Sequence, residues 1–311
     1  MKAVRFHEYG DTGVLRYEDA ERPAPAAGQV LIEVAATSFN PVDAGIRAGY
    51  LQPVFPVAFP HIPGIDVAGT VVGLGDGVTR WSVGDQVIGF LPMVADGAAA
   101  EFVVAPADVL APAPTTIPLT EAAALPAAAQ TAWQALFEHA GLLAGQRILI
   151  SGAGGGVGGF AVQLAKQAGA FVIATASPRS ADAVRAQGAD QLVDYTVTDP
   201  ADALIEQVDV VVSLAMGSAA QLAALTGLVR PGGVIVTTAT PAPADEDRDV
   251  RSVAMQLRAD ADQLATLAKK VDAGELRVEV SATYPLAEAA LVHELSAAGR
   301  IRGKVLLTPA G

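Results

Sequence analysis

Cysteine is absent from this chain of 311 residues. Without a thiol, the chain can form no disulfide, no thiolate zinc site and no cysteine nucleophile. Charged residues are scarce, at 17% of the sequence, and basic residues are the scarcer kind. The 20 Lys and Arg against 33 Asp and Glu give a formal net charge of −13. Because an acidic protein repels phosphate backbones, we expect no nucleic-acid partner.

Long hydrophobic runs are missing as well. Proline, glycine or a charged residue interrupts each apolar stretch before the roughly 18 residues that a membrane helix needs. Residues 1–6 run into a strand-like segment and show no signal-peptide pattern. With 51% hydrophobic residues, the chain still has enough apolar surface for a sizeable core. We therefore expect a globular, cytoplasmic protein that has no membrane partner.

The most informative stretch is a cluster of glycines at residues 152–158. An apolar run at 148–151 precedes it, an amphipathic segment at 157–168 follows it, and a second apolar run stands at 171–176. This order predicts a strand, a tight turn, a helix and a second strand. In such a unit, backbone N–H groups at the helix N-terminus bind the pyrophosphate of a dinucleotide. A glycine turn without a ligand is the alternative, but the flanking strand and helix favour the dinucleotide.

The end of the second apolar run indicates which dinucleotide is bound. NAD-binding units usually place an acidic residue about 20 positions after the first glycine, where it holds the ribose 2′-OH. Residues 174–180 contain no carboxylate here, but they include Ser177, Arg179 and Ser180. Hydroxyls and a guanidinium suit a 2′-phosphate, so NADPH is the predicted cofactor. The alternative for Arg179 is a solvated arginine in a loop.

The rest of the chain divides into a β-rich part and an alternating part. Up to residue 110, β-branched runs alternate with turn residues, which is typical of a small barrel or folded sheet. Residues 105–118 are rich in proline and are expected to be a connecting segment. From residue 120, strand and helix patterns alternate, which predicts a doubly wound parallel sheet. Residues 250–257 are a candidate for its last strand.

These patterns predict an α/β protein with two domains. A Rossmann, NADP-binding domain at 124–256 is inserted into a mostly β catalytic domain made of residues 1–123 and 257–311. Short motifs lie along the whole chain: Asn-Pro-Val-Asp at 40–43, Pro-Gly-Ile-Asp-Val-Ala-Gly at 63–69, Val-Gly-Asp-Gln-Val at 83–87 and Gly-Lys-Val at 303–305. In order and spacing they resemble the medium-chain dehydrogenase/reductases. They resemble most the zinc-independent quinone oxidoreductase branch, which includes ζ-crystallin.

This resemblance implies a GroES-like fold for the catalytic domain and no bound metal. Zinc-containing relatives carry a cysteine at the position of Asn40, a histidine at that of Ile65 and a further cysteine near Ala127. His61 lies close by, but one imidazole cannot make a zinc site, and we expect an ordinary hydrogen bond for it.

The resemblance also implies cofactor contacts. They are Gly155, Gly156 and Val157 for the pyrophosphate, Asn40 and Thr131 for the nicotinamide, and Ser177, Ser180 and Tyr195 for the 2′-phosphate. Some relatives carry a lysine at the position of Ser180, so Arg179 would have to supply the positive charge here.

Without a metal or a thiol, the remaining chemistry is hydride transfer from NADPH to a quinone or to the β-carbon of an enone. Hydrogen-bond donors aimed at the acceptor oxygen would lower the barrier, and Asn40 and Tyr50 are the candidates. Their alternative roles are support of a turn by Asn40 and lining of a pocket by Tyr50. Asp43 is expected to brace the turn that begins at Asn40 rather than to act as an acid.

The predicted function is an NADPH-dependent quinone or enone reductase that acts on a small molecule. A biosynthetic enoyl reductase for a polyketide-like substrate and a non-catalytic protein that binds NADPH or senses redox state remain alternatives. Relatives commonly dimerise through the edge strands of their cofactor domains. Residues 250–257 would be an exposed apolar edge in a monomer, so we also predict a homodimer.

Overall fold

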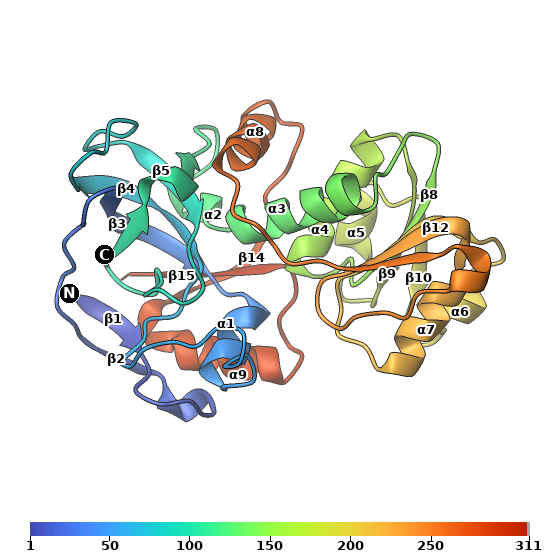
Figure 1. Ribbon diagram of the computed structural model, residues 1–311, viewed down its shortest axis with the longest axis horizontal. Helices are drawn as coiled ribbons and strands as arrows, with labels where there is room; N and C mark the ends of the chain where they lie inside the picture. Colours follow the sequence, from blue (N-terminus) through green and yellow to red (C-terminus); the bar gives the residue numbers. More distant parts are fainter. Residues whose placement is uncertain (310–311) are drawn as a thin grey trace. The chain divides into compact units, whose positions relative to one another are not determined.

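The computed structural model describes residues 1–309. The chain folds as two compact units, one made of Met1–Ala127 with the residues from 259 onward, and the other of Ala128–Arg258. The last two residues of the predicted domain 257–311 lie outside the described residues. Figure 1 labels most of the helices and strands of the two units, which are described separately below.

The first unit is built on a mostly antiparallel sheet. Its strands are β1 (Lys2–Arg5), β2 (Arg16–Asp19), β3 (Gln29–Ser38), β4 (Asp66–Leu74), β5 (Gln86–Phe90), β6 (Phe102–Pro106), β7 (Leu110–Pro112), β14 (Val280–Pro285) and β15 (Lys304–Thr308). The order in the main sheet is β14-β15-β3-β4-β5-β7, with β6 also paired to β3, while β1 and β2 form a separate pair. Val30, Ile32 and Val34 of β3 lie on one face of the strand and are buried in a core shared with β4 and β5. The neighbouring Leu31 is buried as well, so most of β3 is inaccessible to solvent.

Several short helices belong to this unit. They are α1 (Pro41–Arg47), α2 (Leu119–Ala122), α8 (Ala261–Asp272) and α9 (Ala289–Ala297), with 3₁₀ turns at Thr12–Val14, Ala107–Val109 and Leu286–Glu288. Helix α8 begins after Asp260, whose side chain accepts a hydrogen bond from the backbone N–H of Gln263 and so caps the helix. Its apolar face is buried and packs against β7.

The prediction that residues 105–118 only connect two domains is wrong, because this segment contains strand β7. β7 pairs with β5 alone and lies at the end of the sheet. A strand there tolerates proline, because one of its sides needs no ladder hydrogen bonds. The proline content therefore marked an edge strand.

The second unit carries the predicted doubly wound parallel sheet, which the structure confirms. Its strands are β8 (Arg147–Ser151), β9 (Phe171–Ala176), β10 (Gln191–Asp194), β11 (Val208–Ser213), β12 (Val229–Thr237) and β13 (Arg251–Ala254). They run parallel in the order β10-β9-β8-β11-β12-β13. This is the Rossmann order 3-2-1-4-5-6, in which the strand order reverses between β8 and β11. Ligands of such sheets bind beyond the carboxyl ends of the strands at that reversal.

The helices of the second unit connect these strands. They are α3 (Pro126–Trp133, which begins just before the boundary) and its π-helical continuation Gln134–His139, α4 (Gly156–Gln167), α5 (Ala181–Ala186), α6 (Pro200–Ala203), α7 (Ala219–Gly227) and a 3₁₀ turn at Glu246–Arg248. Helix α4 packs against β8 and β9, and α7 against β12. Strand β13 is the edge of the sheet and spans four residues, so it is shorter than the predicted strand at 250–257. Among the described residues, no helix is long and apolar enough to cross a membrane.

Candidate active site

The glycine turn lies between β8 and α4, at the carboxyl end of β8. Gly152 has a φ of +87°, in the left-handed region that favours glycine, and its N–H donates to Thr175 Oγ1 at 2.9 Å. The turn closes where the Gly155 N–H donates to the Gly152 carbonyl at 3.1 Å. Helix α4 then begins at Gly156, and no side chain caps its N-terminus. Its first N–H groups therefore point out of the helix without a side-chain acceptor, as an anion site requires.

Space around the glycines explains why several are needed. A Cβ on Gly154 would lie 2.4 Å from Ser180 Oγ, and one on Gly158 would lie 2.4 Å from the Ala153 carbonyl oxygen. Side chains at these two positions would therefore break the packing of the turn. A Cβ on Gly155 would lie 3.3 Å from the Gly152 carbonyl oxygen, which is tight but not a clash. Gly155 has a φ of −87°, so its backbone conformation does not itself require glycine. Its contact with the pyrophosphate stays a prediction.

The predicted 2′-phosphate residues follow the ends of two neighbouring strands. Ser177 and Ser180 are buried just after β9, and Ser180 donates through Oγ to the Ser177 carbonyl at 3.3 Å. Arg179 is exposed between them, and no Asp or Glu occurs from 174 to 180. Tyr195 follows β10, which pairs directly with β9, and is about half exposed. The structure therefore presents one cation and hydroxyl groups beyond these two strand ends.

Thr131 and Asn40, the two predicted nicotinamide contacts, belong to different units. Thr131 lies on α3 in the second unit and is partly buried. Asn40 lies in the first unit, between β3 and α1. Both assignments stay predictions.

Three strand ends bring polar side chains together around Asn40. Strand β15 runs antiparallel to β3, and the Phe39 N–H donates to the Val305 carbonyl at 2.9 Å. This register places Lys304, the first residue of β15, beside Asn40. Strand β4 pairs with β3 on the other side, which places Asp66, its first residue, there as well.

Asp66 lies at the centre of this cluster and is completely buried. One of its carboxylate oxygens, Oδ2, accepts hydrogen bonds from Ser38 Oγ, from Asn40 Nδ2 at 2.8 Å and from Lys304 Nζ at 3.3 Å. The other oxygen, Oδ1, accepts the Ala127 N–H at 2.7 Å. Burying a carboxylate is costly unless it is paired and hydrogen-bonded, and here both conditions are met.

The Asn40 side chain is fully engaged in the same cluster. Its Nδ2 group donates to the Ser38 carbonyl at 3.1 Å as well as to Asp66, and its Oδ1 accepts from Lys304 Nζ at 2.9 Å. Both N–H groups of the carboxamide are therefore used within the first unit. Direct donation by Asn40 to an acceptor oxygen, as predicted, would require one of these bonds to be exchanged.

Asp43 braces the start of α1, as predicted. Its two carboxylate oxygens accept the backbone N–H groups of Asn40 at 3.1 Å and Gly64 at 3.0 Å. Burial raises the pKa of this carboxyl to about 7, and the two backbone hydrogen bonds only partly oppose the shift. Residues 41–47 form helix α1 where the sequence predicted only a turn, and Asp43 ties the beginning of that helix to the loop before β4.

Tyr50 occupies a different environment from Asn40. It lies in the turn after α1, and 84% of its surface is exposed. Its hydroxyl makes no hydrogen bond to any described residue. Tyr50 is therefore free to meet a ligand, but nothing in the first unit fixes its orientation. Its role as a donor stays a prediction.

His61 is a structural residue. Its ring packs edge-on against Phe6 with 5.2 Å between centroids, and its Nδ1 lies 3.7 Å from Asp96 Oδ1. Burial lowers the pKa of the imidazole, so it is neutral at pH 7. Within residues 1–309, no three His, Cys, Asp or Glu side chains gather where they could hold a metal ion.

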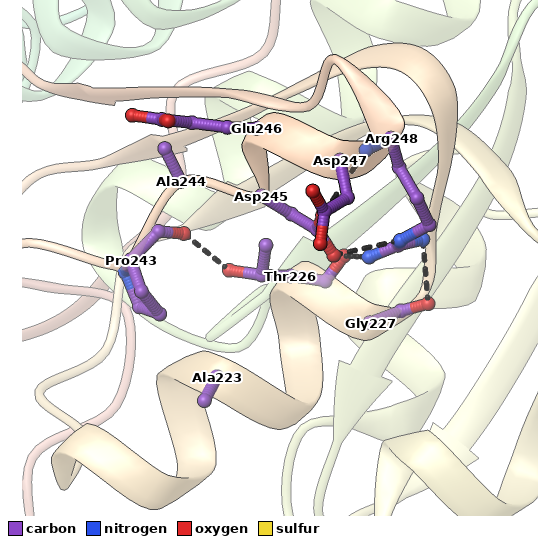
Figure 2. A pocket seen from close by; sticks show the side chains of 9 residues that line it. All are labelled: Ala223, Thr226, Gly227, Pro243, Ala244, Asp245, Glu246, Asp247 and Arg248. Carbon is purple, nitrogen blue, oxygen red and sulfur yellow. Dashed lines mark hydrogen bonds and ion pairs between the residues drawn. The ribbon is translucent and has the colours of Figure 1, made fainter.

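A separate open pocket of about 510 Å³ lies between α7 and the loop before β13 (Figure 2). Its acidic loop is held by Arg248, which donates to Asp245 Oδ2 at 2.7 Å and to the Val229 carbonyl at 2.7 Å. Arg248 also donates to the Thr226 carbonyl at 3.2 Å, in the last turn of α7, where a cation is favoured. None of the predicted site residues lines this pocket, and we assign it no ligand.

Sequence reasoning missed the roles of Ser38, Asp66 and Lys304. Asp66 and Lys304 lie in the quoted motifs, but each reads as the polar start of an apolar strand. A carboxylate followed at once by five residues of a buried strand was the available signal, because a charge there needs a buried partner.

Comparison with known proteins identifies the family. Residues 26–115 match the alcohol dehydrogenase GroES-like domain, and residues 187–307 match the zinc-binding dehydrogenase family. The chloroplast envelope quinone oxidoreductase homolog of Arabidopsis thaliana is 35% identical over 327 residues, which cover 99% of this chain and 98% of that protein. The chain belongs to the quinone oxidoreductase branch of the medium-chain dehydrogenase/reductases. The predicted family and GroES-like domain are thus confirmed.

Two further similarities bear on the chemistry of this branch. The 2-methylene-furan-3-one reductase of Solanum lycopersicum is 33% identical over 322 residues, which cover 99% of this chain and 79% of that protein. A mycobacterial protein solved in complex with NADPH superposes with a TM-score of 0.88 at 28% identity, covering 99% of this chain and all of that one. As a member of the branch, the chain is an NAD(P)H-dependent reductase that acts on a small molecule. The description of one matching family names zinc, but the described residues offer no ligand set for it.

Proposed function

We propose that the chain is an NADPH-dependent reductase that transfers a hydride to a quinone or an α,β-unsaturated carbonyl without zinc. The observation that carries this proposal is the open N-terminus of α4 behind the glycine turn, beside strand ends that present serine and arginine and no acid. The first feature binds a pyrophosphate, and the second prefers a 2′-phosphate to a 2′-hydroxyl.

The residues of the second unit have distinct roles in this proposal. The N–H groups of Gly156 and Val157 hold the pyrophosphate, and the bare Cα of Gly155 lets it approach the backbone. Arg179 supplies the charge opposite the 2′-phosphate, with Ser177 and Ser180 as hydroxyl donors, and Tyr195 flanks this phosphate from the end of β10.

The reaction needs no metal in this proposal. When bound, NADPH supplies a hydride from C4 of its dihydronicotinamide ring, which forms a C–H bond at the β-carbon of an enone. The π electrons of the acceptor move onto the carbonyl oxygen, and a proton from water adds at the α-carbon, so the products are the saturated carbonyl and NADP⁺. With a quinone, one hydride and one proton give the hydroquinone. The role of the chain is to hold the cofactor and to orient the acceptor.

The acceptor class is supported by two observations. No cluster of metal ligands occurs among residues 1–309 to polarise an alcohol. The tomato relative, moreover, is named for the reduction of a conjugated carbonyl. Tyr50 is an exposed donor in the first unit, and we assign it to the pocket for the acceptor.

Isotopic labelling tests the proposal directly. The protein is incubated with NADPH carrying deuterium in either of the two positions at C4, and with a simple enone. We expect deuterium on the β-carbon from one of the two labelled cofactors. A quinone and a saturated alcohol with NADP⁺ are assayed in parallel. Oxidation of the alcohol without turnover of either conjugated acceptor would refute the proposal, and no turnover of any acceptor would favour a non-catalytic NADPH-binding protein.

A further inference from the structure

A buried ion pair holds the Asn40 carboxamide in one orientation. Lys304 as a whole residue is only 4% exposed, and Asp66 is completely buried. Lys304 Nζ donates to Asn40 Oδ1 and to Asp66 Oδ2, at 2.9 and 3.3 Å. The first of these hydrogen bonds joins residues that are 264 positions apart in the chain.

A carboxamide has two orientations that differ by a half-turn, and the partners of Asn40 permit only one. Turning the group would place its N–H groups against the Lys304 ammonium, so that two donors would meet. It would also place its oxygen against the Asp66 carboxylate, so that two acceptors would meet. Both contacts cost energy in a buried site.

Asn40 is the least buried side chain of this network, although it is itself buried. It is 9% exposed, more than Lys304 or Asp66. Its backbone is fixed as well, because its N–H donates to Asp43 Oδ2 at 3.1 Å. The network therefore fixes both the backbone and the carboxamide of Asn40.

We propose that Lys304 is a positioning residue, which Asp66 holds in place and which acts on hydride transfer through the Asn40 carboxamide. This inference rests on the proposed function and on the predicted contact between Asn40 and the nicotinamide ring. Lys304 touches neither the cofactor nor the acceptor in this proposal. Its ammonium sets which face and which atoms of the amide meet the ring.

The first test replaces Lys304 with methionine, which keeps the length of the side chain and removes its charge and donors. We expect the NADPH dissociation constant to change by less than about threefold, because the phosphates are held elsewhere. We expect kcat to fall by about 10²-fold, which is the effect of misplacing reacting groups by about 1 Å. The primary isotope effect with C4-deuterated NADPH should increase, because hydride transfer becomes slower than the other steps. Lys304→Arg, which keeps the cation and its donors, should recover most of kcat.

A double-mutant cycle with Asn40→Ala tests whether Lys304 acts through Asn40. Asn40→Ala alone should lower kcat to a similar extent, and adding Lys304→Met should cause little further loss. Lys166→Met is the matched control, because it removes an ion pair of 2.6 Å with Asp190 that has no link to Asn40. Additive losses in the cycle, or a folded Lys304→Met enzyme with wild-type kcat, would overturn the proposal.

Two further measurements keep the proposal testable. Lys304→Met alone leaves the Asp66 charge buried without its partner and could fail to fold. In that case the double variant Lys304→Met/Asp66→Asn, which removes both charges of the pair, is made, and its kcat is compared with that of Asp66→Asn alone. A wild-type kcat in the folded double variant would again contradict the proposal. If the wild-type protein reduces no acceptor, the proposed function fails, but the fluorescence of bound NADPH still tests Lys304. Its emission should shift in Lys304→Met and in Asn40→Ala but not in Lys166→Met, and identical spectra in all three would refute the role of Lys304.

Discussion

Replacing Gly155 with valine should abolish NADPH binding while the protein still folds. A Cβ at this position would lie 3.3 Å from the Gly152 carbonyl oxygen, a tight contact that a shift of a few tenths of an ångström relieves. The φ of Gly155 is −87°, in the extended region that valine adopts without strain. The added side chain stands at the entry to the uncapped N-terminus of α4, where the pyrophosphate is proposed to bind.

The expected loss of affinity follows from the hydrogen bonds that the side chain blocks. A hydrogen bond from a backbone N–H to a charged oxygen contributes about 1.5–3 kcal/mol. Losing two such bonds corresponds to roughly 3–6 kcal/mol, which raises the NADPH dissociation constant by about 10²–10⁴-fold. A fluorescence titration with NADPH measures this constant, and thermal unfolding followed by circular dichroism shows whether the variant folds.

Two other glycines provide controls. Gly152→Val introduces a branched side chain at a φ of +87°, with its Cβ 3.2 Å from the Ala215 nitrogen. We therefore expect it to lower the melting temperature. Gly227→Val adds a side chain where no atom lies within 4 Å of the Cβ, and it should change neither property. A folded Gly155→Val protein with wild-type NADPH affinity would show that the pyrophosphate does not bind at this turn.

Four further predictions concern charge, metal, pH and assembly. Arg179→Ala should weaken NADPH binding by about 10–100-fold, the loss of one charge-assisted bond, and leave NADH binding within about twofold; equal affinities of the wild-type protein for both cofactors would contradict this. Dialysis against a strong chelator should leave the reductase rate unchanged, and a loss that zinc restores would show a metal requirement. Because burial raises the pKa of Asp43 from 3.8 to about 7, folding is favoured by its protonated form. Its contribution to the free energy of unfolding should therefore be complete below pH 4 and fall by about 4 kcal/mol as the pH rises from 4 through 7. Denaturant unfolding measures it as the free energy of unfolding of wild type minus that of Asp43→Asn, and an increase of this signed difference with pH would contradict the prediction. Strand β13 leaves one sheet edge open, so light scattering should give about twice the chain mass of 31.5 kDa, and a monomer at micromolar concentration would refute the dimer.

Local patterns in the sequence were sufficient for the cofactor unit. Strands β8 and β9 span the predicted residues, and α4 begins within one residue of its predicted start. Each signal here is short in range, because an apolar run, a glycine turn and an amphipathic segment follow one another directly. The strand order could then be predicted as well, since alternating strands and helices with right-handed crossovers leave few topologies.

Local patterns were less informative where an element depends on its neighbours. The sequence predicts a connection where strand β7 lies, because its one proline, Pro112, is typical of loops and is tolerated in a strand only at the edge of a sheet. The sequence predicts only a turn where α1 lies, because the seven residues of this helix begin with proline and include a glycine. Its beginning is stabilised by Asp43, whose second partner, Gly64, is distant in sequence.

By itself, the sequence determined the Rossmann unit and the absence of any cysteine ligand, and it predicts the residues that meet a 2′-phosphate. Only the tertiary structure decided the environment of Asn40. Its amide is oriented by Lys304 and Asp66, which reach it because β15 and β4 flank the end of β3. No local pattern encodes that meeting, because pairing between distant strands is set by the whole sheet and a buried charge shows its partner only once the chain has folded.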